Sequence, residues 1–153
     1  FWGGWTGIAF RNPLFRAGSR LARVLPVDAT RAAGSSLALA AAALERDGHL
    51  VWFPEGQRSD TGELREFLPG VGMLLEAWSD TPVVPVHIEG AHEAWPPGQR
   101  LPRPGRVRVT FGDPVKPSEL AGDGEGKDGD AERRERIAGA LRERVAKLGN
   151  GGA

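Results

Sequence analysis

The sequence predicts an α/β fold, because helical segments alternate with short apolar runs that suit buried strands. Residues 30–47 are dominated by Ala and Leu and contain no proline, which predicts a helix that stops at Gly48. The apolar run 49–53 follows directly, and a similar run lies at residues 82–88. Such runs, bounded by turn residues, are typical of buried parallel strands. We therefore expect helices packed on a central sheet whose strands are mostly parallel.

The remaining segments complete this pattern. Apolar residues recur at helical spacing in three further segments, and two further segments are β-prone. Pro26 interrupts the first of these, which predicts an edge strand or an extended segment, and the second alternates polar with apolar residues like an edge or half-exposed strand. We place the helices at residues 12–25, 70–78 and 131–148, and the strands at residues 24–28 and 106–111.

Length and composition divide the chain into three parts. The 153 residues are enough for one domain with a hydrophobic core, which we assign to residues 1–120, with loops at 54–66 and 95–105. Residues 121–130 are rich in Gly and acidic residues, which predicts a flexible linker. Residues 131–153 then form a surface helix, docked by a thin apolar stripe, and a tail.

The composition also excludes several kinds of site. Without Cys, the chain has no disulfide, no zinc–thiolate site and no cysteine nucleophile. No run approaches the roughly 18 apolar residues that span a bilayer. The start, from Phe1 to Trp5, has neither an initiator Met nor the order of a signal peptide. We therefore expect the chain to be part of a longer protein.

The amino-terminal region is basic, although the whole chain has a formal net charge of zero. Residues 1–31 contain five Arg and a single acidic residue, Asp28. The predicted helix 12–25 gathers several of these Arg on one side, and aromatic residues precede it, which is typical of a segment that contacts an anionic membrane surface. A core-packing helix with an exposed basic face explains the same pattern equally well.

A polar cluster follows the predicted strand 49–53 in the stretch WFPEGQRS. In open α/β sheets, ligands bind beyond the carboxyl ends of strands, where Glu55, Gly56, Arg58 and Ser59 stand. Arg58 can bind a phosphate or carboxylate with two N–H groups, Glu55 can accept from a hydroxyl, and Gly56 lets the backbone approach a ligand. The alternative is an ion pair between Glu55 and Arg58 that only closes a turn.

The segment FPEGQRS, residues 53–59, resembles the FPEGTRS block of the glycerolphosphate and lysophosphatidic acid acyltransferase family, with Gln57 in place of Thr. Downstream, FLPG at 67–70 and VVPV at 83–86 are similar to the family's next blocks in order and spacing. Upstream, PVD at 26–28 stands where the family has a block that usually ends in Arg. The resemblance covers residues 12–117.

The resemblance implies an αβ sandwich and transfer of an acyl group from acyl-CoA or acyl carrier protein to the hydroxyl of a lysophospholipid or glycerol phosphate. It implies that Glu55, Gly56, Arg58 and Ser59 hold the acceptor phosphate. We expect no bound cofactor, and a place at the cytoplasmic face of a membrane, either peripheral or anchored through a missing amino-terminal part. The implied pocket for the acyl chain or the acceptor is lined by Pro54, Val84, Pro85 and Val86.

One departure concerns the catalytic block of the family, N-H-x-x-x-x-D, in which His acts as general base and Asp orients it. The residues five positions after His49, His87 and His92 are Pro54, His92 and Pro97, so no His of this chain fits. We therefore expect the block upstream of Phe1, the amino-terminal part of the domain to be missing, and the chain alone to be inactive.

The sequence admits three other interpretations. A metal site at the pair of His and the pair of Glu within residues 87–93 matches no standard ligand spacing. Nucleic-acid binding is disfavoured by the balanced charge and by Trp residues that form no stacking strip. A non-catalytic, membrane-associated module that binds lipid phosphate remains as the alternative, since it needs no base.

Overall fold

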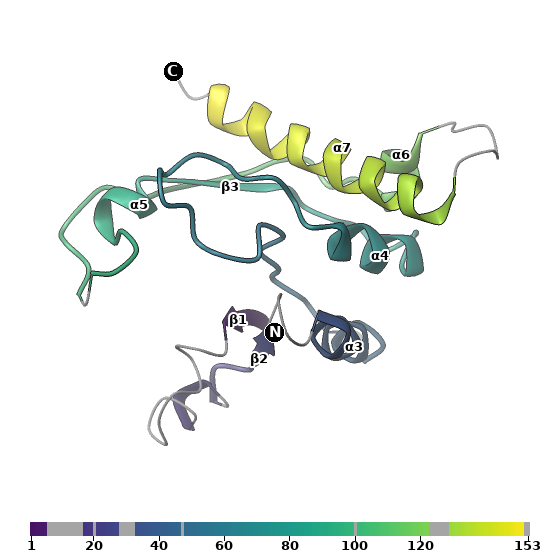
Figure 1. Cartoon of the computed structure of the whole chain (residues 1–153), viewed down its shortest axis with the longest axis horizontal. Helices are drawn as coiled ribbons and strands as arrows, with labels where there is room; N and C mark the ends of the chain where they lie inside the picture. Colours follow the sequence, from purple (N-terminus) through teal and green to yellow (C-terminus); the bar gives the residue numbers. More distant parts are fainter. Residues whose placement is uncertain are drawn as a thin grey trace. The chain divides into compact units, whose positions relative to one another are not determined.

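The computed structural model describes residues 1–5, 17–19, 21–27, 33–46, 48–99, 101–122 and 129–151 (Figure 1). These residues fall into two compact units, residues 1–57 and residues 58–153, which we describe separately. Residues 12–16 and 20 of the predicted basic helix 12–25 and residues 123–128 of the predicted linker 121–130 lie outside the described residues. Residues 17–19 and 21 are helical, whereas residues 24–25 belong to a strand, so the predicted helix extends too far at its end.

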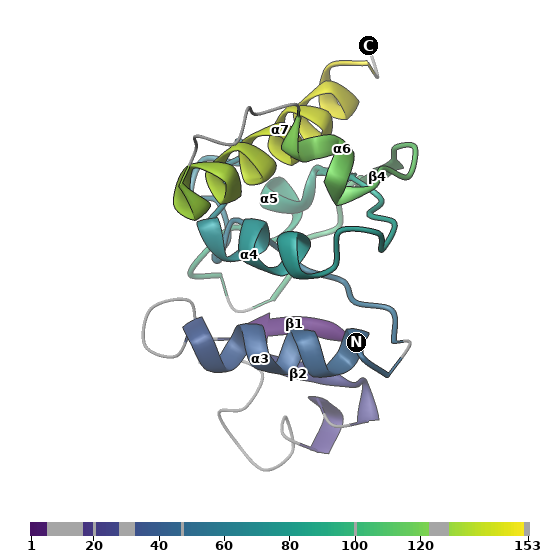
Figure 2. The ribbon, with the colours of Figure 1, turned by 90° about the vertical axis from the view of Figure 1, so that its right-hand side faces the viewer.

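The first unit is a parallel strand pair covered by a helix (Figure 2). Strand β1, Trp2–Trp5, pairs with β2, Val24–Val27, with Trp2 opposite Val24. Helix α3, Ala33–Leu44, packs against β2 and buries Ala40 and Ala43. The predicted helix 30–47 and the strand at 24–28 are thus confirmed in their cores. Strand β1 was not predicted, since its two central glycines are unfavourable in strands.

The prediction of a buried strand at residues 49–53 is wrong. Val51 is 37% exposed and Phe53 49% exposed, and neither belongs to a regular strand. Two backbone bonds of the segment go to Phe1, whose amino group donates to the His49 carbonyl at 2.6 Å and whose carbonyl accepts from Val51 N–H at 2.8 Å. An apolar run becomes a buried strand only when other segments pair with it and cover both faces, and local sequence does not report those neighbours.

The second unit is an antiparallel strand pair covered by a long helix, on which two shorter helices also pack (Figure 1). Strands β3, Val86–Glu89, and β4, Arg108–Phe111, pair with Val86 opposite Phe111. The long helix α7, Asp130–Asn150, packs on this pair and on α4, Pro69–Ala77, and α6, Pro117–Ala121. The short helix α5, Ala91–Ala94, follows β3 directly. The core side chains are Val71, Leu74, Leu75, Val115, Leu120, Ile137, Leu141 and Val145.

The predictions for this unit are partly confirmed. Helices 70–78 and 131–148 correspond to α4 and α7, and the half-exposed strand 106–111 corresponds to β4. The strand predicted at 82–88 starts at Val86 and is not buried, because Ile88 is 42% exposed. Side chains alternate along a strand, so the helix that covers one face leaves Ile88 on the other. Helices α5 and α6 were not predicted.

The sheet differs from the expected one. Among the described residues, the strands form one parallel pair and one antiparallel pair in place of a single, mostly parallel sheet. Val83 and Val115 extend the antiparallel pair by an isolated bridge, with N···O distances of 2.9 Å in both directions. Alternation of helices and strands therefore predicted the fold class, whereas it did not predict which strands pair.

Helices α4 and α7 approach each other closely at Gly72. A Cβ atom at this position would lie 2.7 Å from the carbonyl carbon and 2.9 Å from the Cα of Arg134. Beside this contact, Arg134 Nε donates to Glu76 Oε2 at 2.6 Å. This hydrogen bond raises the pKa of Arg134 above its usual value. The contact between the two helices thus depends on the absence of a side chain at Gly72 and on the ion pair between Arg134 and Glu76.

Candidate functional site

The predicted phosphate-binding residues are divided between the two units. Pro54, Glu55 and Gly56 belong to the first unit, and all three are half-buried. Gly56 has a φ of 73° and its N–H donates to the Phe53 carbonyl at 3.2 Å, which forms a tight turn. This positive φ favours glycine, so the structure gives Gly56 a conformational role in the turn.

Arg58 begins the second unit and has an exposed side chain whose direction is fixed by Trp95. Its Nη1 donates to the Trp95 carbonyl at 3.2 Å, and the guanidinium carbon lies 5.5 Å from the centroid of a Trp95 ring. The indole is itself held, because Trp95 Nε1 donates to the Gln99 carbonyl at 2.9 Å. A guanidinium has five N–H groups, so the single bond to Trp95 leaves donors for an anion.

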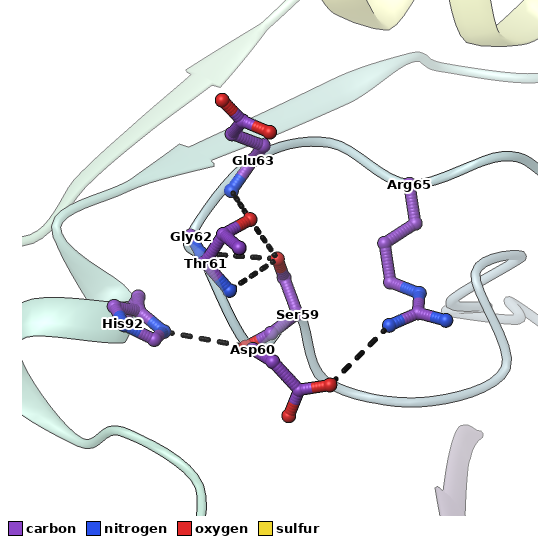
Figure 3. Close-up of polar contacts among 7 residues, drawn as sticks. All are labelled: Ser59, Asp60, Thr61, Gly62, Glu63, Arg65 and His92. Carbon is purple, nitrogen blue, oxygen red and sulfur yellow. Dashed lines mark hydrogen bonds and ion pairs between the residues drawn. The ribbon is translucent and has the colours of Figure 1, made fainter.

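The segment from Ser59 to Glu63 is a turn closed by its own hydroxyl groups (Figure 3). Ser59 Oγ accepts from the N–H of Thr61 at 3.3 Å and of Gly62 at 3.0 Å, and Thr61 Oγ1 accepts from Glu63 N–H at 3.3 Å. Hydroxyl side chains commonly shape loops in this way. In this structure the oxygen of Ser59 therefore shapes the loop; its predicted contact with substrate stays a prediction.

His92 of α5 joins the same turn from a distant part of the sequence (Figure 3). Its Nδ1 lies 3.2 Å from the Ser59 carbonyl oxygen. Because a carbonyl only accepts, Nδ1 carries the hydrogen in this bond. Gly62, with a φ of 86°, lies so close that a Cβ there would come within 3.2 Å of the His92 Cβ. No sequence pattern indicated this role of His92, because helix α5 was not predicted.

The far end of the loop is held by Arg142 of α7. Its Nε donates to the Arg65 carbonyl at 3.0 Å, and its Nη2 donates to the Leu64 carbonyl at 3.3 Å. The same nitrogen lies 3.1 Å from Glu66 Oε1. Residues 58–66 are thus held near both ends by side chains that lie far away in the sequence, which fixes the loop without a strand or helix of its own.

The predicted pocket residues occupy different environments. Pro85 is buried and its carbonyl accepts from Gly112 N–H at 2.9 Å, whereas Val84 is 44% exposed and Val86 is half-buried. These three residues belong to the second unit and Pro54 to the first. The assignment of a pocket to them stays a prediction.

The two histidines of the strand-end segment 87–93 have different surroundings. The His87 ring packs at Gly149 of α7, where a Cβ would lie 2.7 Å from the ring, and His92 bonds to Ser59. Within the described ranges, no group of three or more His, Asp or Glu side chains is placed to hold a metal ion.

Of the five arginines in residues 1–31, the structure describes only Arg23. Arg23 lies with its guanidinium carbon 5.8 Å from the Phe1 ring centroid, and the other four Arg of residues 1–31 lie outside the described residues. Among the helices that the structure describes, none is both long and apolar enough to cross a membrane.

Comparison with known proteins extends this description. A family model described as Acyltransferase matches residues 6–89. Two curated 1-acyl-sn-glycerol-3-phosphate acyltransferases are similar in sequence: one from Cocos nucifera, 33% identical over 78 residues, and one from Limnanthes alba, 37% identical over 71 residues. These matches cover 51% and 46% of this chain and 25% of each relative.

A solved structure is also similar. The 1-acyl-sn-glycerophosphate (LPA) acyltransferase PlsC from Thermotoga maritima superimposes with a TM-score of 0.55 at 28% sequence identity. The superposition covers 73% of this chain and 45% of that protein. The chain thus spans about a quarter of the curated relatives and less than half of the solved structure.

Proposed function

The chain belongs to the acyltransferase family that includes the 1-acyl-sn-glycerol-3-phosphate acyltransferases, and from this premise we propose that it binds the phosphate-bearing acceptor of an acyl transfer reaction. The acyl group passes from acyl-CoA or acyl carrier protein to a hydroxyl of a lysophospholipid or glycerol phosphate, as a step in phospholipid synthesis. The family assignment made from the FPEGQRS segment is confirmed.

The observation that carries the proposal is the placement of Arg58. Its side chain is exposed but oriented by Trp95, and its remaining N–H groups are available to an anion. Two parallel N–H donors match two oxygens of a phosphate, which a single ammonium cannot do. We assign Arg58 as the phosphate clamp; a role for Glu55 and Gly56 in phosphate binding rests on the family motif alone.

The proposal assigns acceptor binding to this chain and assigns no general base to it. His92 is engaged with the Ser59 carbonyl, and no His is followed by Asp at the spacing of the family's catalytic block. We propose that Val84, Pro85 and Val86 of the second unit contribute to a pocket for the acyl chain or the acceptor.

The test is acyl transfer by the complete gene product with lysophosphatidic acid or glycerol 3-phosphate as acceptor. We expect Arg58→Ala to raise the acceptor KM by about 10- to 100-fold, since a charge-assisted hydrogen bond contributes about 1.5–3 kcal/mol. Arg58→Lys should rescue only part of the loss. Arg103→Ala removes another exposed Arg of the same unit and should leave the acceptor KM unchanged. An acceptor KM that Arg58→Ala does not change would refute the assignment.

The second candidate function is a membrane-associated module that binds lipid phosphate without catalysis. The Arg excess of residues 1–31 favours membrane contact in either case, and we propose the cytoplasmic face of an anionic membrane. The fraction of protein that sediments with anionic vesicles should fall as ionic strength rises. Binding that depends on neither lipid charge nor salt would contradict this. Phosphate binding that depends on Arg58, without any acyl transfer by the complete gene product, would favour the module.

A further inference from the structure

Helix α5 and the residue after it hold the loop that carries Arg58 through two kinds of contact, one to the loop backbone and one to the Arg58 side chain. His92 in α5 bonds to the backbone of the loop at Ser59, and Trp95, directly after α5, holds the side chain of Arg58. These contacts join residues that are 33 and 37 positions apart in the sequence. Resting on the proposed function, we propose that His92 and Trp95 are positioning residues that set the affinity for the acceptor phosphate by presenting Arg58.

Helix α5 is suited to this role because it is fixed independently of the loop. The residue before α5, Gly90, has a φ of 76° and no room for a Cβ beside the Arg106 carbonyl, so only glycine fits there. At its other end, the Ala94 carbonyl accepts from Arg103 N–H at 2.7 Å. The segment that leads into β4 thus lies against the residue before α5 and is hydrogen-bonded to the last residue of α5, which supports the helix apart from the loop.

His92 fixes the backbone next to Arg58. Its Nδ1–H donates to the carbonyl of Ser59, and its Cβ and ring pack over Gly62, where any side chain would be crowded. The Ser59 hydroxyl closes the turn between these two contacts. The peptide that follows Ser59 is therefore held from inside the turn and from α5, and Arg58, one residue earlier, leaves the loop in a defined direction.

Trp95 fixes the Arg58 side chain itself. An unrestrained Arg loses much rotamer freedom when it binds a phosphate, and this loss subtracts from affinity. The Trp95 carbonyl and ring hold the guanidinium before the acceptor arrives. Since neither His92 nor Trp95 needs to contact the acceptor or the acyl donor, their loss should weaken acceptor binding and leave the donor KM and kcat unchanged.

The experiment combines variants of α5 with Arg58→Ala in the complete gene product. We expect His92→Leu, which removes the donor at similar volume, to raise the acceptor KM about two- to tenfold, the usual effect of one net hydrogen bond. His92→Asn should restore the wild-type acceptor KM, because its amide nitrogen reaches the same carbonyl as Nδ1. Glu93→Gln, an exposed position of the same helix, is the matched control and should change nothing.

The double variant Arg58→Ala/His92→Leu separates positioning from general stability. If His92 acts only through Arg58, its loss has no further effect once Arg58 is gone, and the double variant matches Arg58→Ala. Trp95→Leu provides a second test at a side chain that is 44% exposed, should His92→Leu fail to fold, and it should also raise the acceptor KM.

The outcomes distinguish the inference from the function on which it rests. If Arg58→Ala leaves the acceptor KM unchanged, the proposed function is overturned and the inference with it. If Arg58→Ala raises the acceptor KM but His92→Leu and Trp95→Leu do not, only the inference is overturned. An effect of His92→Leu that persists in full in the Arg58→Ala background, or that appears in kcat and not in the acceptor KM, also overturns it.

Discussion

Replacing Gly72 by Ala should destabilise the second unit, although Ala is the better helix former. A new Cβ would lie 2.7 Å from the carbonyl carbon and 2.9 Å from the Cα of Arg134, whereas carbon atoms pack at about 3.5–4.0 Å. The neighbouring atoms are backbone, so no change of rotamer relieves the contact. Helices α4 and α7 must separate by about 1 Å, and a gap of that size forfeits up to about half of each dispersion contact.

The expected change in the free energy of unfolding on Gly72→Ala is the sum of two opposing effects. Overpacking of a core typically costs about 1–3 kcal/mol, and the better helix propensity of Ala returns up to about 1 kcal/mol. Because the contact is with a fixed backbone, we take the upper part of the range and expect a net loss of about 2 kcal/mol. Leu74 and Leu75 of α4 and Ile137 of α7 are buried two or three residues along the chain from Gly72 or Arg134, so a separation of the helices also affects core side chains.

Urea unfolding of the chain, followed by circular dichroism, measures this effect against a matched control. Gly139 lies in the middle of α7 and a Cβ there meets nothing within 4 Å. Gly139→Ala should therefore stabilise the helix by about 0.5–1 kcal/mol. If Gly72→Ala proves as stable as Gly139→Ala, the close approach of α4 and α7 is not as described.

Two further predictions concern ion pairs of α7. Arg142→Met should destabilise the loop by about 1 kcal/mol, the usual contribution of a net hydrogen bond, because the Leu64 and Arg65 carbonyls lose their donor; faster limited proteolysis within residues 58–66 would show it, and unchanged cleavage would contradict it. Glu76→Gln should lower the urea midpoint. The pKa of Arg134 is raised, so Arg134 stays charged and its stabilising effect on the fold is lost only above its usual pKa. The difference in urea midpoint between Glu76→Gln and wild type should therefore be constant from about pH 7 to about pH 10. A difference that shrinks within that range would contradict this reasoning.

The helices could be predicted from the sequence, because their signals are local. The apolar stripe of α7 and the apolar residues of segment 70–78 are local patterns, and α7 and α4 lie within a residue or two of where these patterns predict them. Burial of the runs 49–53 and 82–88 was predicted wrongly, because it depends on which other segments pair with and cover them. Composition does not carry that information.

The candidate site could be predicted only in part. Arg58 could be selected from its position after an apolar run and from a family motif. The residues that hold its loop could not, because His92, Trp95 and Arg142 reach it across 33, 37 and up to 78 positions of the sequence. Their roles come from hydrogen bonds to backbone carbonyls, which any residue type supplies, so no sequence pattern marks the partner.

The Arg142 anchor also imposes an order on biosynthesis. Arg65 leaves the ribosome 77 residues before Arg142, so at about 5–20 residues per second the loop waits roughly 4–15 s for its far anchor. During that interval the turn of residues 59–63 is closed only by its own hydroxyl groups and, once α5 has emerged, by His92. A nascent chain stalled before α7 should therefore be digested readily at this loop, and the same loop should become resistant once α7 has emerged.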